Sequence, residues 1–180
     1  IDLSVGSTMA AAGLLAAALL LAGFPVLFVV VATMIFGAAI GLFNGLLIAT
    51  FGMADFIVTL GMMSVLGGLI MVYSEGVPLF GLRVPAFQWL GQGYVGQIPV
   101  PVIIGLILFM VCWIMLYRTE FGRQVIAIGS NAKAASLVGL PIQRTRIMVY
   151  GLSGLFAAVS GIMLTSRLEA AMPEAAMGYE

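Results

Sequence analysis

The run from Pro25 to Thr50 contains no charged side chain, and this feature limits the folds open to the chain more than any other. As an α-helix it would be about 39 Å long, which exceeds the roughly 30 Å hydrocarbon core of a bilayer. Hydrophobic residues make up 63% of the sequence and charged residues 8%, whereas soluble domains carry about 25% charged residues. The apolar runs do not alternate with polar residues as barrel strands do. The sequence therefore predicts an all-α integral membrane protein, built as a polytopic bundle of transmembrane helices.

About five membrane spans are predicted, separated by turns or polar loops. They cover residues 7–22, 25–50, 56–73, 100–117 and 147–165. The first is short of a full span, so its helix either extends back over Asp2 or is broken near Gly6. A carboxylate near the bilayer centre costs about 2.5 to 3.5 kcal/mol on insertion scales. We therefore expect Asp2 at a membrane interface, where it could cap the helix, or facing a wet cavity.

Two long loops differ in charge, and this difference predicts the orientation in the membrane. Residues 118–146 carry five basic side chains and one acid, a net charge of five minus one, or +4, so this loop is expected in the cytoplasm. Residues 74–99 are rich in proline, glycine and aromatic residues and are expected to form an external loop at the interface. The tail from Ser166 is expected on the same external side. Asp55 is predicted to cap the third span.

The basic loop contains a short predicted helix with both ends marked. Asn131 can cap its N-terminus, and Gly139 can adopt the left-handed conformation that ends a helix. Ala134, Leu137 and Val138 form a small apolar face at helical spacing. Such a face could dock in a groove of another protein, although short interfacial helices are usually structural. Both interpretations are open at this point.

Small residues recur along two of the spans. Gly37, Gly41 and Gly45 lie at intervals of four, which places them on one helix face with Asn44 beside them. Ser153, Ala157 and Gly161 form a similar face on the last span. Asn44 is expected to support close packing or, alternatively, to line a substrate pathway. The residues that we assign to helix packing are Gly37, Gly41, Gly45, Gly154 and Gly161.

Several kinds of chemistry are missing from the sequence. There is no histidine and one cysteine, Cys112, which excludes a disulfide framework, a haem site and a Cys/His metal site within this chain. The only lysine, Lys133, does not belong to a phosphate-binding loop. We find no paired carboxylates, no nucleophile with a base and no patch for nucleic acid. We expect a chain that is no enzyme and binds no cofactor or metal, so energy for uphill transport must come from a partner.

The residues resemble a known family, the permease subunits of bacterial ATP-binding cassette importers for ribose, xylose, arabinose and galactose, a group that includes autoinducer-2 permeases. The matching segments follow the family's order and cover nearly the whole chain. They are Ile1 to Ser7, Asn44 to Ile48, Phe56 to Gly61, Thr119 to Arg123, Ala127 to Asn131, Ala134-Ala135 with Gly139, Tyr150 to Leu155 and Ser166 to Leu168. Two positions depart from the usual pattern, Asp55 in place of a proline and Ser130 in place of a glycine. Both fit local turn or cap roles.

The resemblance implies a multi-pass protein of the bacterial inner membrane whose basic loop carries the coupling helix, the segment that contacts the cytoplasmic ATPase. It implies four partners: ATPase subunits that use ATP and Mg²⁺, a second permease copy, a periplasmic sugar-binding protein and the lipid bilayer. It also implies transport by alternating access, in a family whose chain continues on both sides of this piece. The residues expected to take part in coupling are Arg123, Asn131, Lys133, Ala134, Ala135, Leu137 and Gly139.

The sugar pathway is predicted less sharply. A sugar has many hydroxyl groups and no charge, which suits a cavity with neutral hydrogen-bonding groups. The candidates are the polar residues of the matched segments that lie at or within the membrane, namely Asp2, Ser4, Asn44 and Thr59. A secondary transporter or channel that needs no ATPase remains an alternative. A subunit that assembles with a transporter without itself transporting is another.

Overall fold

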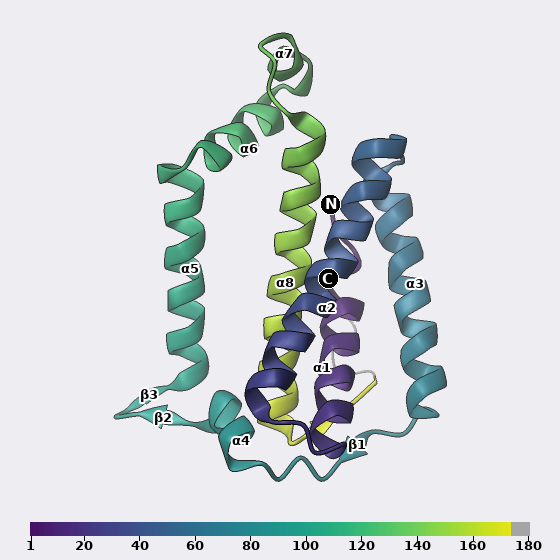
Figure 1. The fold of residues 1–180 in the computed structure, drawn as a ribbon, viewed down its shortest axis with the longest axis vertical. Coiled ribbons are helices and arrows are strands. Elements are labelled where there is room, and N and C mark those ends of the chain that lie inside the picture. The colour runs from purple at the N-terminus through teal and green to yellow at the C-terminus, as the bar shows by residue number, and fades with distance from the viewer. Residues whose placement is uncertain (174–180) are drawn as a thin grey trace.

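The computed structural model describes residues 1–173 and confirms an all-α membrane architecture (Figure 1). Four helices in this part are long and apolar enough to cross a bilayer, and a fifth, α1, is shorter. The bounds of the five are Val5–Leu21 for α1, Val26–Phe51 for α2, Asp55–Ser74 for α3, Val100–Arg118 for α5 and Ile142–Leu168 for α8. The end of the predicted external tail, residues 174–180, lies outside the described residues.

The bundle is centred on α2, α8 and α1, which contact one another along much of their length. α3 lies on the far side of α2 and α1 from α8 in Figure 1, and α5 stands apart from α8. Among its described residues α5 buries only Val100. The core of the described chain is therefore the three-helix unit, and α5 is connected to it through its two ends.

Glycines allow α2 and α8 to pack with their backbones in contact. A Cβ atom added at Gly41 would collide with the carbonyl oxygen of Tyr150, and one at Gly45 would lie 2.8 Å from the Cα of Ile147. On the opposing helix, Gly154 faces the carbonyl oxygen of Gly37. Because no side chain larger than hydrogen fits at these positions, the helices approach as closely as small-residue motifs permit. The predicted small-residue faces of the two helices thus lie against each other.

α1 packs on α8 in the same way between Met9 and Gly13. A Cβ atom on Gly161 would collide with the carbonyl oxygen of Met9, and one on Gly13 with the hydroxyl of Thr165. α1 begins at Val5 after the non-helical residues 1–4, so it neither extends back over Asp2 nor breaks near Gly6. Its 17 residues span about 26 Å, less than the hydrocarbon core.

At one end of the bundle two helices replace most of the predicted basic loop. α6 spans Glu120–Ser130 and α7 spans Ala132–Leu137. The α6 helix was not predicted, and α8 begins at Ile142, before the expected start at residue 147. The physical reason is that a helix continues beyond the hydrocarbon layer where water and headgroups accept its charged side chains, such as Arg144 and Arg146.

At the opposite end, the predicted loop over residues 74–99 contains the helix α4, Pro85–Gln92. Its residue Phe87 is fully buried, and the Ser166 hydroxyl of α8 donates a hydrogen bond of 2.6 Å to the Phe87 carbonyl. Two short antiparallel pairs complete this end. They join β1 (Leu79–Phe80) to β4 (Ala170–Ala171) and β2 (Tyr94–Val95) to β3 (Ile98–Pro99). The interpretation of these residues as a loop alone was therefore wrong.

The prediction that Asp55 caps α3 was also wrong. The N-cap is Ala54, whose backbone is extended, and Asp55 is the first residue of the helix. Its carboxylate accepts no capping hydrogen bond but lies in the first turn, where the positive end of the helix dipole favours an acid.

Candidate functional site

The first candidate site is α7, a rigid turn at the outermost end of the molecule (Figure 1). The Asn131 side chain accepts a hydrogen bond of 3.0 Å from the Ala134 amide, which confirms the predicted N-cap. Gly139 has φ 78°, the left-handed conformation expected after the helix. Both ends of this six-residue helix are thus fixed by local interactions, although a helix this short is unstable alone in water.

The predicted coupling residues divide into an inner and an outer set. Ala135 is only 4% exposed and packs inward, whereas Leu137 is 88% exposed and the adjoining Val138 is 77% exposed. Ala134 and Lys133 are also exposed. The apolar surface that α7 offers to a partner is therefore made by Leu137 and Val138, together with the small side chain of Ala134. We call these three residues the α7 apolar surface.

Two further predicted coupling residues flank this surface. Arg123 lies on α6, is exposed, and forms an ion pair of 3.8 Å with Glu120 one turn earlier. Gly139 follows α7 and connects it to the start of α8. After Val138, only Gly139, Leu140 and Pro141 lie between α7 and the start of α8 at Ile142.

The second candidate site is a polar network at the start of α1. The Asp2 Oδ1 atom accepts hydrogen bonds from the backbone amide of Ser4 at 3.0 Å and from its hydroxyl at 2.7 Å. The Asn44 amide of α2 donates to the Ser4 hydroxyl oxygen at 3.0 Å. From α8, the Ser153 hydroxyl donates to Asp2 Oδ2 at 2.8 Å. The Asp2 carboxylate thus bonds directly to the start of α1 and to α8 and reaches α2 through Ser4, and we call these four residues the Asp2 network.

Three of the four predicted pathway residues meet in this network, and the fourth does not. Ser4 and Asn44 are buried between helices. Thr59 is buried on α3 and donates a hydrogen bond of 2.8 Å to the Asp55 carbonyl of its own helix. The side chains of Ser4, Asn44 and Thr59 hold the structure together, and of the predicted set Asp2 lines the cavity described below.

The Asp2 network lies within the membrane-spanning depth. Ser153 follows the start of α8 by eleven residues, or about 16 Å, and Asn44 precedes the end of α2 by seven residues, or about 10 Å. Figure 1 shows the start of α1, beside the N-terminus, well below the outer ends of both helices. The Asp2 carboxyl group therefore lies beside α2 and α8, away from the outer ends of both helices, and lines a cavity.

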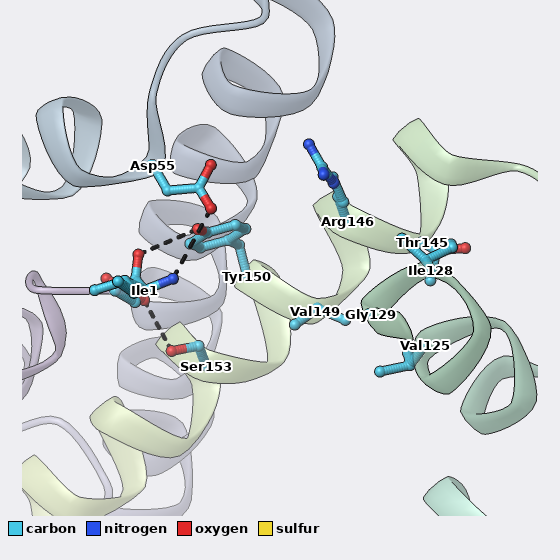
Figure 2. Close-up of a pocket in the computed structure, with 11 residues that line it drawn as sticks. Ile1, Asp55, Val125, Ile128, Gly129, Thr145, Arg146, Val149, Tyr150 and Ser153 are labelled. Carbon is cyan, nitrogen blue, oxygen red and sulfur yellow. Dashed lines mark hydrogen bonds and ion pairs between the residues drawn. The ribbon is translucent and has the colours of Figure 1, made fainter. Parts of the chain in front are cut away.

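The cavity next to Asp2 has a volume of about 410 Å³ (Figure 2). The Tyr150 hydroxyl lies at its wall and donates a hydrogen bond of 3.2 Å to the Ile1 carbonyl. Sequence reasoning did not select the polar groups that α8 adds here, because Ser153 was assigned to a packing face and Tyr150 and Arg146 to no site. The polar side chains that line the cavity are Asp2, Asp55, Thr145, Arg146, Tyr150 and Ser153.

The lining combines hydrogen-bond acceptors and donors with a small excess of negative charge. Two carboxylates and one guanidinium give a side-chain charge of one minus two, or −1. Three hydroxyl groups can both donate and accept. Within residues 1–173 no group of three or more His, Cys, Asp or Glu side chains is placed to hold a metal ion. The polar part of the lining can form hydrogen bonds with a ligand that carries several hydroxyl groups.

Comparison with known proteins places the chain in a family. All of residues 1–180 match the family described as branched-chain amino acid transport system permease component. The whole chain is 43% identical to the ribose import permease protein of Bacillus subtilis and 40% identical to that of Escherichia coli K12. It is 37% identical, again over its whole length, to the L-arabinose permease protein of Azospirillum brasilense.

The chain spans little more than half the length of these curated relatives, 56%, 57% and 53% respectively. No solved structure matches it. The match to the family nevertheless covers every residue, including α7 and the Asp2 network. The chain is therefore a multi-pass membrane protein that belongs to the family of branched-chain amino acid transport system permease components.

Proposed function

We propose that this chain is the central part of a non-catalytic permease subunit of an ATP-binding cassette importer that carries a monosaccharide across the bacterial inner membrane. The observation that carries the proposal is the identity of 35% to 43%, over the whole chain, to permeases named for ribose, allose and arabinose. The subunit would pair with a second permease copy and receive sugar from a periplasmic binding protein.

The family description names amino acids, so the substrate class needs its own argument. A branched-chain amino acid carries two opposite charges and an apolar side chain, and a site for it needs an apolar pocket. The cavity beside Asp2 presents three hydroxyls, two carboxylates and a guanidinium next to the apolar side chains of Ile1, Val125, Ile128 and Val149, so its lining does not separate the two substrate classes. The identity to permeases named for ribose, allose and arabinose is what supports a sugar. The polar groups of the lining suit the hydroxyls of an uncharged sugar. We propose that Asp2, Tyr150 and Ser153 line the sugar passage and that Ser4, Asn44 and Thr59 support its walls.

Energy is proposed to enter through α7. Leu137 and Val138 expose apolar side chains on a capped helix beyond the membrane-spanning part of α8. Burial of such side chains is favourable by roughly 25 cal/mol for each Å² removed from water. We propose that a cytoplasmic ATPase, which binds ATP and Mg²⁺, buries the α7 apolar surface and moves it during the transport cycle.

The first test is copurification of the full-length protein with its ATPase. Leu137→Arg is expected to reduce the recovered ATPase at least about tenfold, since a charged side chain would replace an exposed apolar contact. Gln97→Arg, an exposed position at the opposite end of the molecule, is the matched control. Ala135→Arg is a poorer test because Ala135 is buried and its replacement would disturb α7 itself. Equal ATPase recovery from both variants would contradict docking at α7.

The second test measures uptake of labelled ribose in cells that express the full-length protein. Uptake should cease on ATP depletion, and excess unlabelled ribose or arabinose should compete with the label whereas leucine should not. Uptake that survives ATP depletion but collapses with the membrane potential would support the secondary-transporter alternative. Competition by leucine alone would move the substrate class to amino acids.

A further inference from the structure

We propose that Asp2 is a positioning residue, whose hydrogen bond to Ser153 makes the membrane-embedded start of α1 move together with α2 and α8 during transport. This inference rests on the proposed function, because it concerns how movement at α7 reaches the sugar passage. It assigns to Asp2 and Ser153 a role in coupling, at a distance from the ATPase contact.

The first step concerns the unit that α7 would move. After Gly139 and Pro141 the chain enters α8, which continues unbroken from Ile142 to Leu168. α8 is locked to α2 because Gly41 and Gly45 of α2 contact the α8 backbone directly. A displacement of α7 is therefore passed to α8 and α2 as one body, since close-packed backbones do not slide independently.

The second step concerns the start of α1, where Ser4, Gly6 and Thr8 are buried and polar bonds add to the packing. The contacts of Gly13 with Thr165 and of Gly161 with Met9 fix the part of α1 that follows its first turn. Its first residues are also attached by polar bonds, those between Asp2, Ser4, Asn44 and Ser153 and the one from Tyr150 to the Ile1 carbonyl. Loss of Asp2 would therefore remove one of the two side-chain hydrogen bonds that join residues 1–4 to α8 and leave the rest of the helix in place.

The third step separates positioning from a local role at the start of α1. Asp2 Oδ1 accepts from the Ser4 amide and hydroxyl, but Ser4 is itself the N-cap of α1, with no side-chain capping bond. A local role needs nothing from another helix, yet Asp2 Oδ2 accepts from Ser153, 151 positions away in the sequence. A carboxylate inside a membrane is costly unless its oxygens are bonded. The bond to α8 therefore helps to fix where α1 begins, and Ser153 can be altered without touching the bonds from Oδ1 to Ser4.

Because cavities lie on both sides of Ser153, its hydrogen bond to Asp2 is important for the position of the cavity wall formed by residues 1–4. Ser153 lines the cavity of about 410 Å³ and also a second one of about 270 Å³ between α8, α5 and α6. Ser153 is thus flanked by two cavities, and its hydrogen bond to Asp2 joins α8 to residues 1–4 between them. Without it, the wall of the sugar passage formed by residues 1–4 would follow α8 less closely, because only part of its polar connection, such as the Tyr150 bond to the Ile1 carbonyl, would remain.

The experiment uses the full-length permease with its ATPase in proteoliposomes, supplied with sugar-loaded binding protein. The quantity measured is the amount of sugar taken up for each ATP hydrolysed. Ser153→Ala is expected to lower this ratio about tenfold, because a charge-assisted hydrogen bond between moving elements is lost. Asp2→Ala should lower it at least as much. Asp2→Asn, which keeps a hydrogen-bonding group of the same shape, should restore the ratio to within about twofold of the unmodified protein.

Two matched controls identify the cause. Ser160→Ala removes an exposed hydroxyl of the same helix that bonds only to its own backbone, at the Phe156 carbonyl. Glu75→Gln removes an exposed carboxylate at the end of α3, outside the cavity. Both should keep the normal ratio. An equal loss in either control would show that the loss in Ser153→Ala is not specific to the bond with Asp2 and would overturn the proposal.

An unchanged ratio in Ser153→Ala would also overturn the proposal. If that variant is poorly folded, Ser153→Thr, which retains the hydroxyl, must restore both folding and the ratio, and its failure would count equally against positioning. These outcomes differ from failure of the proposed function, in which the unmodified protein would show no sugar uptake driven by ATP.

Discussion

At the scale of single residues, the spacing of Gly37, Gly41 and Gly45 predicted a close contact but could not name its partner. The partner is α8, whose own small residues lie more than a hundred positions later in the chain. The same limit applied to the polar residues. Asp2 and Asn44 were selected for their polarity, whereas Ser153 was assigned to packing because a serine between small residues fits either role. Whether such a residue serves packing or a polar site depends on contacts between segments that are distant in the sequence. The spacing of residues within one helix gives no information about those contacts.

Gly41 offers the sharpest test at this scale. In the full-length protein in detergent, Gly41→Ala is expected to lower the melting temperature by several degrees, because its methyl group would collide with a carbonyl oxygen that cannot rotate away. Overpacking of this kind costs about 1 to 3 kcal/mol. Gly68→Ala, at a helical position with nothing within 4 Å, is the control and should cause no loss. Equal melting of the two variants would contradict the close contact of α2 and α8.

At the scale of elements, long apolar helices were predicted well and short ones poorly. The prolines and glycines around residues 74–99 indicated a loop, yet Pro85 starts α4, where its fixed φ and missing amide suit the first helical position. α6 mixes charged and apolar residues and was included in a loop. α7 was predicted because Asn131 and Gly139 mark its two ends. Local capping signals are therefore informative for a short helix, and hydropathy is not.

The Asn131 cap can be tested by hydrogen exchange on the full-length protein. Asn131→Ala removes the acceptor of the Ala134 amide, and loss of a cap costs about 1 kcal/mol. Amides of α7 are therefore expected to exchange about fivefold faster. Asn131→Asp keeps a side-chain oxygen in place and should leave exchange nearly unchanged. Unaltered exchange in the alanine variant would mean that other contacts hold α7.

At the scale of the whole molecule, the described helices bury much less than a compact domain does. α3 and α5 expose long apolar faces that include Ile57, Val72, Leu106 and Phe109. In a membrane these faces can contact lipid or other helices. Composition predicted this setting correctly, since 63% hydrophobic residues cannot be buried inside a bundle of this size. It could not predict that α1 starts inside the membrane depth, because that depends on where its neighbours begin and end.

The orientation of the whole molecule follows from charge and can be tested with thiol labelling. In a Cys112→Ser background of the full-length protein, with any further cysteines replaced, Lys133→Cys on α7 and Gln97→Cys on the β2–β3 turn place one exposed thiol at each end. The five basic residues of 118–146 should keep α7 in the cytoplasm. A membrane-impermeant reagent is therefore expected to label Gln97→Cys in intact spheroplasts and Lys133→Cys only in inverted vesicles. The reverse pattern would place α7 outside, where no cytoplasmic ATPase could reach it, and both the orientation and the proposed energy input would then be wrong.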